Sequence, residues 1–292
     1  MRRRWPAIVV IALLAACGST SQNSPEPTPL PNVFDKVDIG GYRLAYQCVG
    51  SGSPTIIAEA GYNIGGTTAF AGVLEPIGQI SRICTYDRAG TGNSDDRPRS
   101  EAKGLTSEDQ ARELHALLQA AAIEPPYVVV AHSYGGFVSR LFAATYPDET
   151  IGLVLIESSH EDEIVPYRRY FRDDPKEADW VDGGDLLDID ATAAALRAKA
   201  RDFGSMPLIV IRAETYDDVL SESLWRRTQA DLATLSTDGI EIEASHSGHF
   251  VQDDNPDVVV GAVRAVVDAA RAGAPLAACA DIIAGLDVRC LT

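Results

Sequence analysis

Ser133 is the residue of this sequence best placed for nucleophilic chemistry, because it stands between a strand pattern and a helix pattern. Residues 127–131 form a short apolar run rich in β-branched side chains, typical of a buried parallel strand, and residues 137–144 follow a helical pattern. Ala131 and Gly135 are small, so strand and helix can pass close together at a sharp turn. Such a turn exposes the hydroxyl above a helix N-terminus, where free N–H groups favour negative charge. The pattern predicts a serine nucleophile.

Two further motifs accompany this turn. Residues 86–95 read Tyr-Asp-Arg-Ala-Gly-Thr-Gly-Asn-Ser-Asp, and residues 247–250 read Ser-Gly-His-Phe ahead of Asn-Pro and a last helix. With the serine turn between them, they resemble three successive motifs of the α/β-hydrolases, over about residues 37–272. The resemblance implies an α/β fold with a mostly parallel eight-stranded sheet, helices on both faces and a small cap insert at about residues 161–203. It does not identify a substrate, because one fold hosts many chemistries.

The resemblance also implies roles for individual residues. A serine hydroxyl is a poor nucleophile at neutral pH, so His249, at the matching position, is expected to accept the proton of Ser133 during attack. The backbone N–H groups of Tyr62 and Tyr134 are the expected oxyanion donors. The chain has Ala60-Gly61 where the family usually has His-Gly, which a contribution from the backbone tolerates.

The acid that orients the histidine has more than one candidate. Most members of the family carry it after the seventh strand, where Asp217 is the nearest match but stands one residue late, with Glu214 close by. Some members carry it at the end of the sixth strand, where Glu157 directly follows the apolar run 151–156. We favour Glu157 and keep Asp217 as the alternative.

Three functions are compatible with these residues. The first is a serine hydrolase that cleaves a small-molecule or lipid-like carboxylic ester, thioester or amide through an acyl-enzyme. An acyltransferase or a cofactor-free peroxidase would use the same triad, and a surface-binding protein with an inactive site belongs to another class. A serine at the turn excludes the dehalogenases and epoxide hydrolases of this fold, which need an aspartate there. No cofactor or metal is expected, because none of the five histidines has an i,i+4 ligand partner on a predicted helix.

The N-terminus predicts export and a lipid anchor. Residues 1–16 combine three arginines with a short apolar run that ends in small residues, as a secretory signal peptide does. The ending Leu-Ala-Ala-Cys resembles a bacterial lipobox, which implies cleavage before Cys17 and acylation of that cysteine, for example with palmitate. Residues 17–36 are rich in Ser, Pro and Thr and read as a tether. The protein is then expected on the outer side of a bacterial cell membrane; the alternative is an ordinary secretory signal with an incidental cysteine.

The charge balance excludes one class of partner. The chain has 25 basic and 42 acidic residues, and removal of the three leader arginines would leave 22 basic residues and a net charge of −20. A protein this acidic is not expected to bind nucleic acid. The same excess of acid leaves the acyl chains, and not basic side chains, as the membrane anchor.

Four cysteines remain after Cys17, all within residues 37–292, the predicted hydrolase domain. An even number in an exported chain predicts disulfides, and four cysteines allow three pairings. In the α/β-hydrolases the second and fourth strands are neighbours, so the resemblance selects Cys48–Cys84. Cys279–Cys290 then closes a short C-terminal loop.

Overall fold

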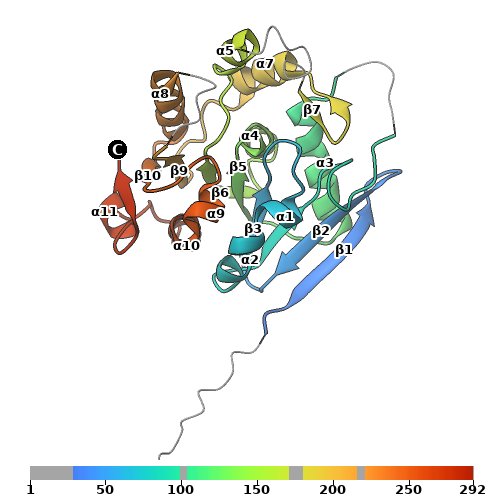
Figure 1. Cartoon of the computed structure of the whole chain (residues 1–292). Helices are drawn as coiled ribbons and strands as arrows, with labels where there is room; N and C mark the ends of the chain where they lie inside the picture. Colours follow the sequence, from blue (N-terminus) through green and yellow to red (C-terminus); the bar gives the residue numbers. More distant parts are fainter. Residues whose placement is uncertain (1–28, 99–103, 171–179, 216–220, 292) are drawn as a thin grey trace, which may run out of the picture.

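A nine-stranded sheet forms the centre of the computed structural model, which describes residues 29–98, 104–170, 180–215 and 221–291 (Figure 1). β1 and β2 are antiparallel at one edge, β11 is antiparallel at the other, and all pairs from β4 to β10 are parallel. The spatial order is β1 (Asn32–Asp38), β2 (Arg43–Val49), β4 (Ile83–Tyr86), β3 (Thr55–Glu59), β5 (Tyr127–His132), β6 (Thr150–Ile156), β9 (Leu208–Ala213), β10 (Gly239–Ala244) and β11 (Val288–Cys290). The predicted fold class is confirmed.

Helices cover both faces of this sheet, and each face has its own hydrophobic core. One core includes Leu114 of α3 (Ser107–Ala120) and Leu141 of α4 (Gly135–Thr145). The other includes Ile77 of α2 (Ala71–Gly78) and Val263 of α10 (Pro256–Ala272). The central strands are buried on both sides, which is why they appear in the sequence as continuous apolar runs. The structure also contains α8 (Glu222–Ala233) and the one-turn helices α1 (Gly66–Ala69), α9 (Val251–Asp254) and α11 (Cys279–Ile282).

The two edges of the sheet differ from the prediction. The sheet has nine strands and not eight, because the three residues of β11 pair with β10 near the C-terminus. The tether predicted to reach residue 36 ends earlier, since β1 already begins at Asn32 and pairs along its whole length with β2. Both strands lie at edges, β1 has mostly exposed side chains and β11 has only three residues, so neither produces a marked apolar run.

The segment between β6 and β9 contains α5 (Ile164–Tyr170), the hairpin β7 (Val181–Asp182) and β8 (Asp185–Leu186), and α7 (Ile189–Lys199). These elements lie within residues 161–203, the range predicted for the cap insert. α7 and the hairpin lie beyond the ends of the central strands, next to α3 and α4 (Figure 1). The cap therefore stands over the edge at which the parallel strands end.

The structure contains two disulfides, one between neighbouring strands and one between a helix and an edge strand. Cys48 and Cys84 are directly opposite each other on β2 and β4, with their Cα atoms 4.0 Å apart. Cys279 of α11 is bonded to Cys290 of β11, with a Cα separation of 6.1 Å. These are the two pairs that the resemblance selected, and the second holds the short ninth strand to the helix beside it.

Candidate active site

Ser133 occupies the turn between β5 and α4, where its backbone has a φ of +53°. A non-glycine residue in this left-handed region is strained, which is expected of a nucleophile presented on a sharp turn. Gly135 is required here, because an added Cβ would lie 2.6 Å from the carbonyl oxygens of Glu59 and Ala60. Helix α4 can therefore begin directly against the end of β3.

His249 lies in the loop between β10 and α9, and its Nε2 is 3.0 Å from the Oγ of Ser133. Its Nδ1 faces the carboxylate of Glu157, with 3.4 Å between Nδ1 and Oε2. The Ala213 N–H donates a 2.6 Å hydrogen bond to the other carboxylate oxygen of Glu157. The structure thus brings together three sequence-predicted residues from the ends of three different strands.

Glu157 directly follows β6, also has a positive φ (+46°), and is buried. Burial raises the pKa of its carboxyl, although His249, the Ala213 N–H and the Trp225 side chain act in the opposite direction. A desolvated carboxylate interacts strongly with a nearby cation, because little water screens the pair. The position suits an acid that stabilises an imidazolium on His249.

The other candidate acids differ in their surroundings. The carboxylate of Glu214 accepts a 2.7 Å hydrogen bond from the backbone N–H of His246. His246 itself is exposed and pairs with Asp287, away from Ser133. Asp217 lies outside the described residues. Among the described candidates, Glu157 is the one whose carboxylate reaches His249.

The two expected oxyanion donors flank the serine. Tyr134 follows it directly and is the N-cap of α4. Tyr62 belongs to the loop after β3, which abuts the serine, since a Cβ added to Gly61 would lie 3.4 Å from the Cβ of Ser133. The rings of Tyr62 and Tyr134 meet edge to face, with centroids 6.3 Å apart.

His132 also contributes to the site, although the sequence analysis assigned it no role. Its Nε2 lies 2.8 Å from the carbonyl oxygen of His249, so it braces the loop that carries the proposed base. Burial lowers the pKa of His132 to about 3, with a smaller effect of His249 in the same direction. The ring is therefore neutral at physiological pH, and Nε2 is the nitrogen that donates. Its place directly before the nucleophile was the signal in the sequence.

A cavity of about 350 Å³ opens over these residues. Most of its lining is apolar and comes from both the core and the cap, including Phe137, Ile164, Tyr167, Trp180 and Trp225. The lining also contains Glu163, a partly exposed residue whose carboxyl pKa is raised to about 7 by desolvation. A mostly apolar cavity with a few polar groups at one end is the usual form of a small-molecule site.

The arrangement can transfer a proton from a serine hydroxyl to an imidazole that a buried carboxylate orients. A serine activated in this way attacks carbonyl carbons. In the described residues, no group of three or more His, Cys, Asp or Glu side chains is arranged to hold a metal ion.

Comparisons with known proteins identify the fold family. A family model described as alpha/beta hydrolase fold matches residues 63–179. The uncharacterized protein YqjL of Bacillus subtilis is 31% identical over 215 residues, which cover 72% of this chain and 82% of YqjL. The solved structure of Cfl2 from Burkholderia cenocepacia has a TM-score of 0.60 and 19% identity, over 84% of this chain and 98% of Cfl2. A thermophilic esterase from Thermogutta terrifontis has a TM-score of 0.57 and 20% identity, over 82% and 99%. At these identities the two solved structures share the fold alone.

Proposed function

Because the chain belongs to the alpha/beta hydrolase fold family, we propose that it is a serine hydrolase that cleaves carboxylic esters. The observation that carries the proposal is the pair of contacts that links Ser133 to His249 and His249 to Glu157. These contacts supply a nucleophile, a general base and an orienting acid at the floor of one cavity. Thioesters and amides present the same carbonyl carbon to the same groups.

In the proposed reaction, the Oγ of Ser133 attacks the ester carbonyl while Nε2 of His249 accepts the hydroxyl proton. The carbonyl oxygen becomes an oxyanion, which the backbone N–H groups of Tyr62 and Tyr134 stabilise. When the tetrahedral intermediate collapses, the bond to the leaving oxygen breaks, and that oxygen departs as an alcohol with the proton from His249. Water then attacks the acyl-serine in the same way and releases the carboxylic acid.

The cavity indicates the kind of ester. Its aromatic and aliphatic lining favours an apolar group on the acyl or alcohol side, because burial of apolar surface stabilises binding by roughly 25 cal/mol per Å². A volume of about 350 Å³ favours a group of moderate size over a long chain.

A panel of p-nitrophenyl esters with graded acyl chains tests this proposal on the full-length protein. We expect hydrolysis with an optimum at a short or medium chain, and covalent labelling by a fluorophosphonate probe that a preferred ester slows. Absence of both hydrolysis and labelling would contradict the proposal. Added alcohol distinguishes the related reaction, because an acyltransferase would form the new ester in preference to the free acid.

We further propose that the protein is exported and anchored through lipid on Cys17. The support is the sequence of the leader, and Cys17 lies outside the described residues. Within the part that the structure describes, no helix has both the length and the apolar character needed to cross a membrane.

Cys17→Ala should abolish lipidation, because the cysteine thiol is the proposed acylation site. In a bacterial host fed an alkyne fatty acid, the wild-type protein should take up label and sediment with membranes, while the variant should take up none. Ser19→Ala, which changes a neighbouring residue of the tether, should behave as wild type. Equal labelling of Cys17→Ala and wild type would rule the anchor out.

A further inference from the structure

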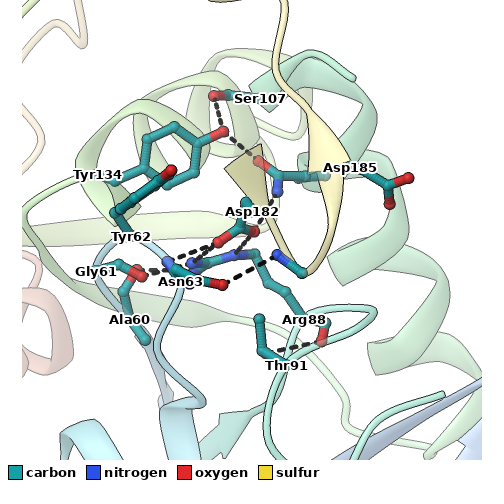
Figure 2. A network of polar contacts seen from close by, with 12 residues as sticks. Ala60, Gly61, Tyr62, Asn63, Arg88, Thr91, Ser107, Tyr134, Asp182 and Asp185 are labelled. Carbon is teal, nitrogen blue, oxygen red and sulfur yellow. Dashed lines mark hydrogen bonds and ion pairs between the residues drawn. The ribbon is translucent and has the colours of Figure 1, made fainter. Parts of the chain in front are cut away.

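Arg88 lies at the centre of a buried polar network beside the candidate oxyanion donors (Figure 2). Its side chain is 2% exposed, and the partners Glu59, Asp182 and Gln110 are equally buried. Its guanidinium donates to the carboxylate of Glu59 at 2.6 Å and to both oxygens of Asp182, at 2.7 Å from Nε and 2.9 Å from Nη2. Such a two-pronged contact fixes direction as well as distance.

One arm of the network holds the loop that precedes Tyr62. Arg88 also donates to the carbonyl oxygens of Ala60, at 2.9 Å, and Gly61, at 2.5 Å. These two peptide groups lead directly into Tyr62, whose N–H is one candidate oxyanion donor. The guanidinium therefore limits how the peptide plane before Tyr62 can rotate.

Asp182, which belongs to the cap hairpin, holds the other side of the same tyrosine. Its Oδ1 accepts a 2.8 Å hydrogen bond from the backbone N–H of Asn63. The neighbouring Val181 N–H donates to the phenol oxygen of Tyr62 at 2.7 Å. Both neighbours of Tyr62 in the chain are therefore held in place: Arg88 holds Gly61, and Asp182 holds Asn63.

A second arm runs from Asp182 to the other candidate donor residue. Its Oδ2 accepts a 2.9 Å hydrogen bond from Nε2 of Gln110, and the Oε1 of Gln110 accepts one from the phenol of Tyr134 at 2.5 Å. The Tyr134 phenol oxygen also lies 2.9 Å from the hydroxyl of Ser107 (Figure 2). Because Tyr134 directly follows Ser133, this arm fixes the side chain at the start of α4.

The hairpin that carries Asp182 packs closely on the loop that carries Arg88. A Cβ added to Gly90 would lie 1.9 Å from the carbonyl oxygen of Gly183, so the two backbones are in direct contact. Burial alone would raise the pKa of Asp182, but the charge and hydrogen bonds of Arg88 outweigh that effect and lower it. The carboxylate is therefore ionised at neutral pH and paired with the guanidinium.

We infer that Asp182 is a positioning residue that orients both backbone N–H donors of the oxyanion hole, so that docking of the cap hairpin completes the hole. The inference rests on the proposed serine hydrolase function. It adds to that function a link between the cap and the stabilisation of the transition state.

Asp182→Asn tests the inference, since in either orientation an amide of the same shape places an N–H donor against Arg88 and against Gln110 or Asn63. We expect kcat to fall by about 10²-fold, on the order of the loss of one oxyanion donor, with KM changed by less than about threefold. Affinity for a trifluoromethyl ketone analogue of a good ester, which forms an oxyanion on Ser133, should fall in parallel with kcat. Asp185→Asn is the matched control, because Asp185 lies on the same hairpin and pairs with Arg97 on its outer side.

The outcomes separate the two claims. If the wild-type protein neither hydrolyses esters nor reacts with a fluorophosphonate, the proposed function fails and the inference fails with it. If the wild type is active and Asp182→Asn matches Asp185→Asn in kcat and analogue affinity, only the inference is overturned. Should Asp182→Asn not fold, Gln110→Leu decides, because it cuts the arm to Tyr134 and leaves the Arg88–Asp182 pair in place. That variant should lose about tenfold in kcat and in analogue affinity, and wild-type values would overturn the inference.

Discussion

Ser133→Ala is expected to reduce kcat for ester hydrolysis by a factor on the order of 10⁶, the loss seen when a triad that acts as a unit loses its nucleophile. The hydroxyl is the atom that forms the acyl-enzyme, and His249 has no proton to accept without it. KM should change little, because the methyl side chain of alanine leaves the cavity lining in place. The measurement is single-ester kinetics, together with loss of fluorophosphonate labelling.

Ser139→Ala provides the matched control for this variant. Ser139 lies on the helix that follows the nucleophile, is fully buried, and its Oγ has no hydrogen-bond partner among the described residues. Removing a buried hydroxyl without a partner costs little stability, so this variant should keep wild-type kinetics. If Ser133→Ala kept more than a tenth of the wild-type kcat, Ser133 would not be the nucleophile.

Glu157→Gln should reduce kcat by about 10⁴-fold, as an aspartate-to-amide change does in another triad. The Ala213 N–H requires an acceptor, so the new side chain will keep its carbonyl oxygen there and turn its NH₂ group toward His249. The imidazole must then accept at Nδ1 and carry its proton on Nε2. In that tautomer it cannot accept the proton of Ser133.

Two control variants test whether the loss of activity is specific to the carboxylate of Glu157. Glu214→Gln removes the charge of an acid that contacts His246, and Asp217→Asn removes the alternative acid; each should cost tenfold or less. All variants should be measured on the same ester, with circular dichroism to show that they are folded. If Asp217→Asn loses most of its activity while Glu157→Gln stays near wild type, the acid of the triad is Asp217 and not Glu157. If both variants lose little activity, neither residue is the partner of the histidine.

The parts of the fold that the sequence predicts well are those that local patterns determine. The runs at 127–131 and 151–156 became β5 and β6, because strands buried on both faces must be apolar throughout. Glu157 could be identified because it directly follows such a run, and Ser133 because it stands two residues after one, at the turn into a helix pattern. In the structure, each of them contacts His249.

The parts that the sequence did not predict depend on contacts between distant segments. β1 and β11 exist because they pair with β2 and β10, and their own residues carry little apolar pattern. Asp182 stands in a short stretch of Val, Asp and Gly that predicts only a turn. Its role depends on Arg88, whose motif was identified without its partner, since no local signal links two residues that far apart.

The distance along the chain between these partners has a consequence for how activity arises during synthesis. Ser133 and His249 are 116 residues apart, and Asn63 and Asp182 are 119 apart. Closing such long loops has an entropic cost, and folds rich in long-range contacts form slowly. When only the first half of the chain has been synthesised, Ser133 is present without His249, and Tyr62 without the hairpin that carries Asp182. On the proposed mechanism, the set of Ser133, Glu157 and His249 is complete only once the last quarter of the chain has been synthesised.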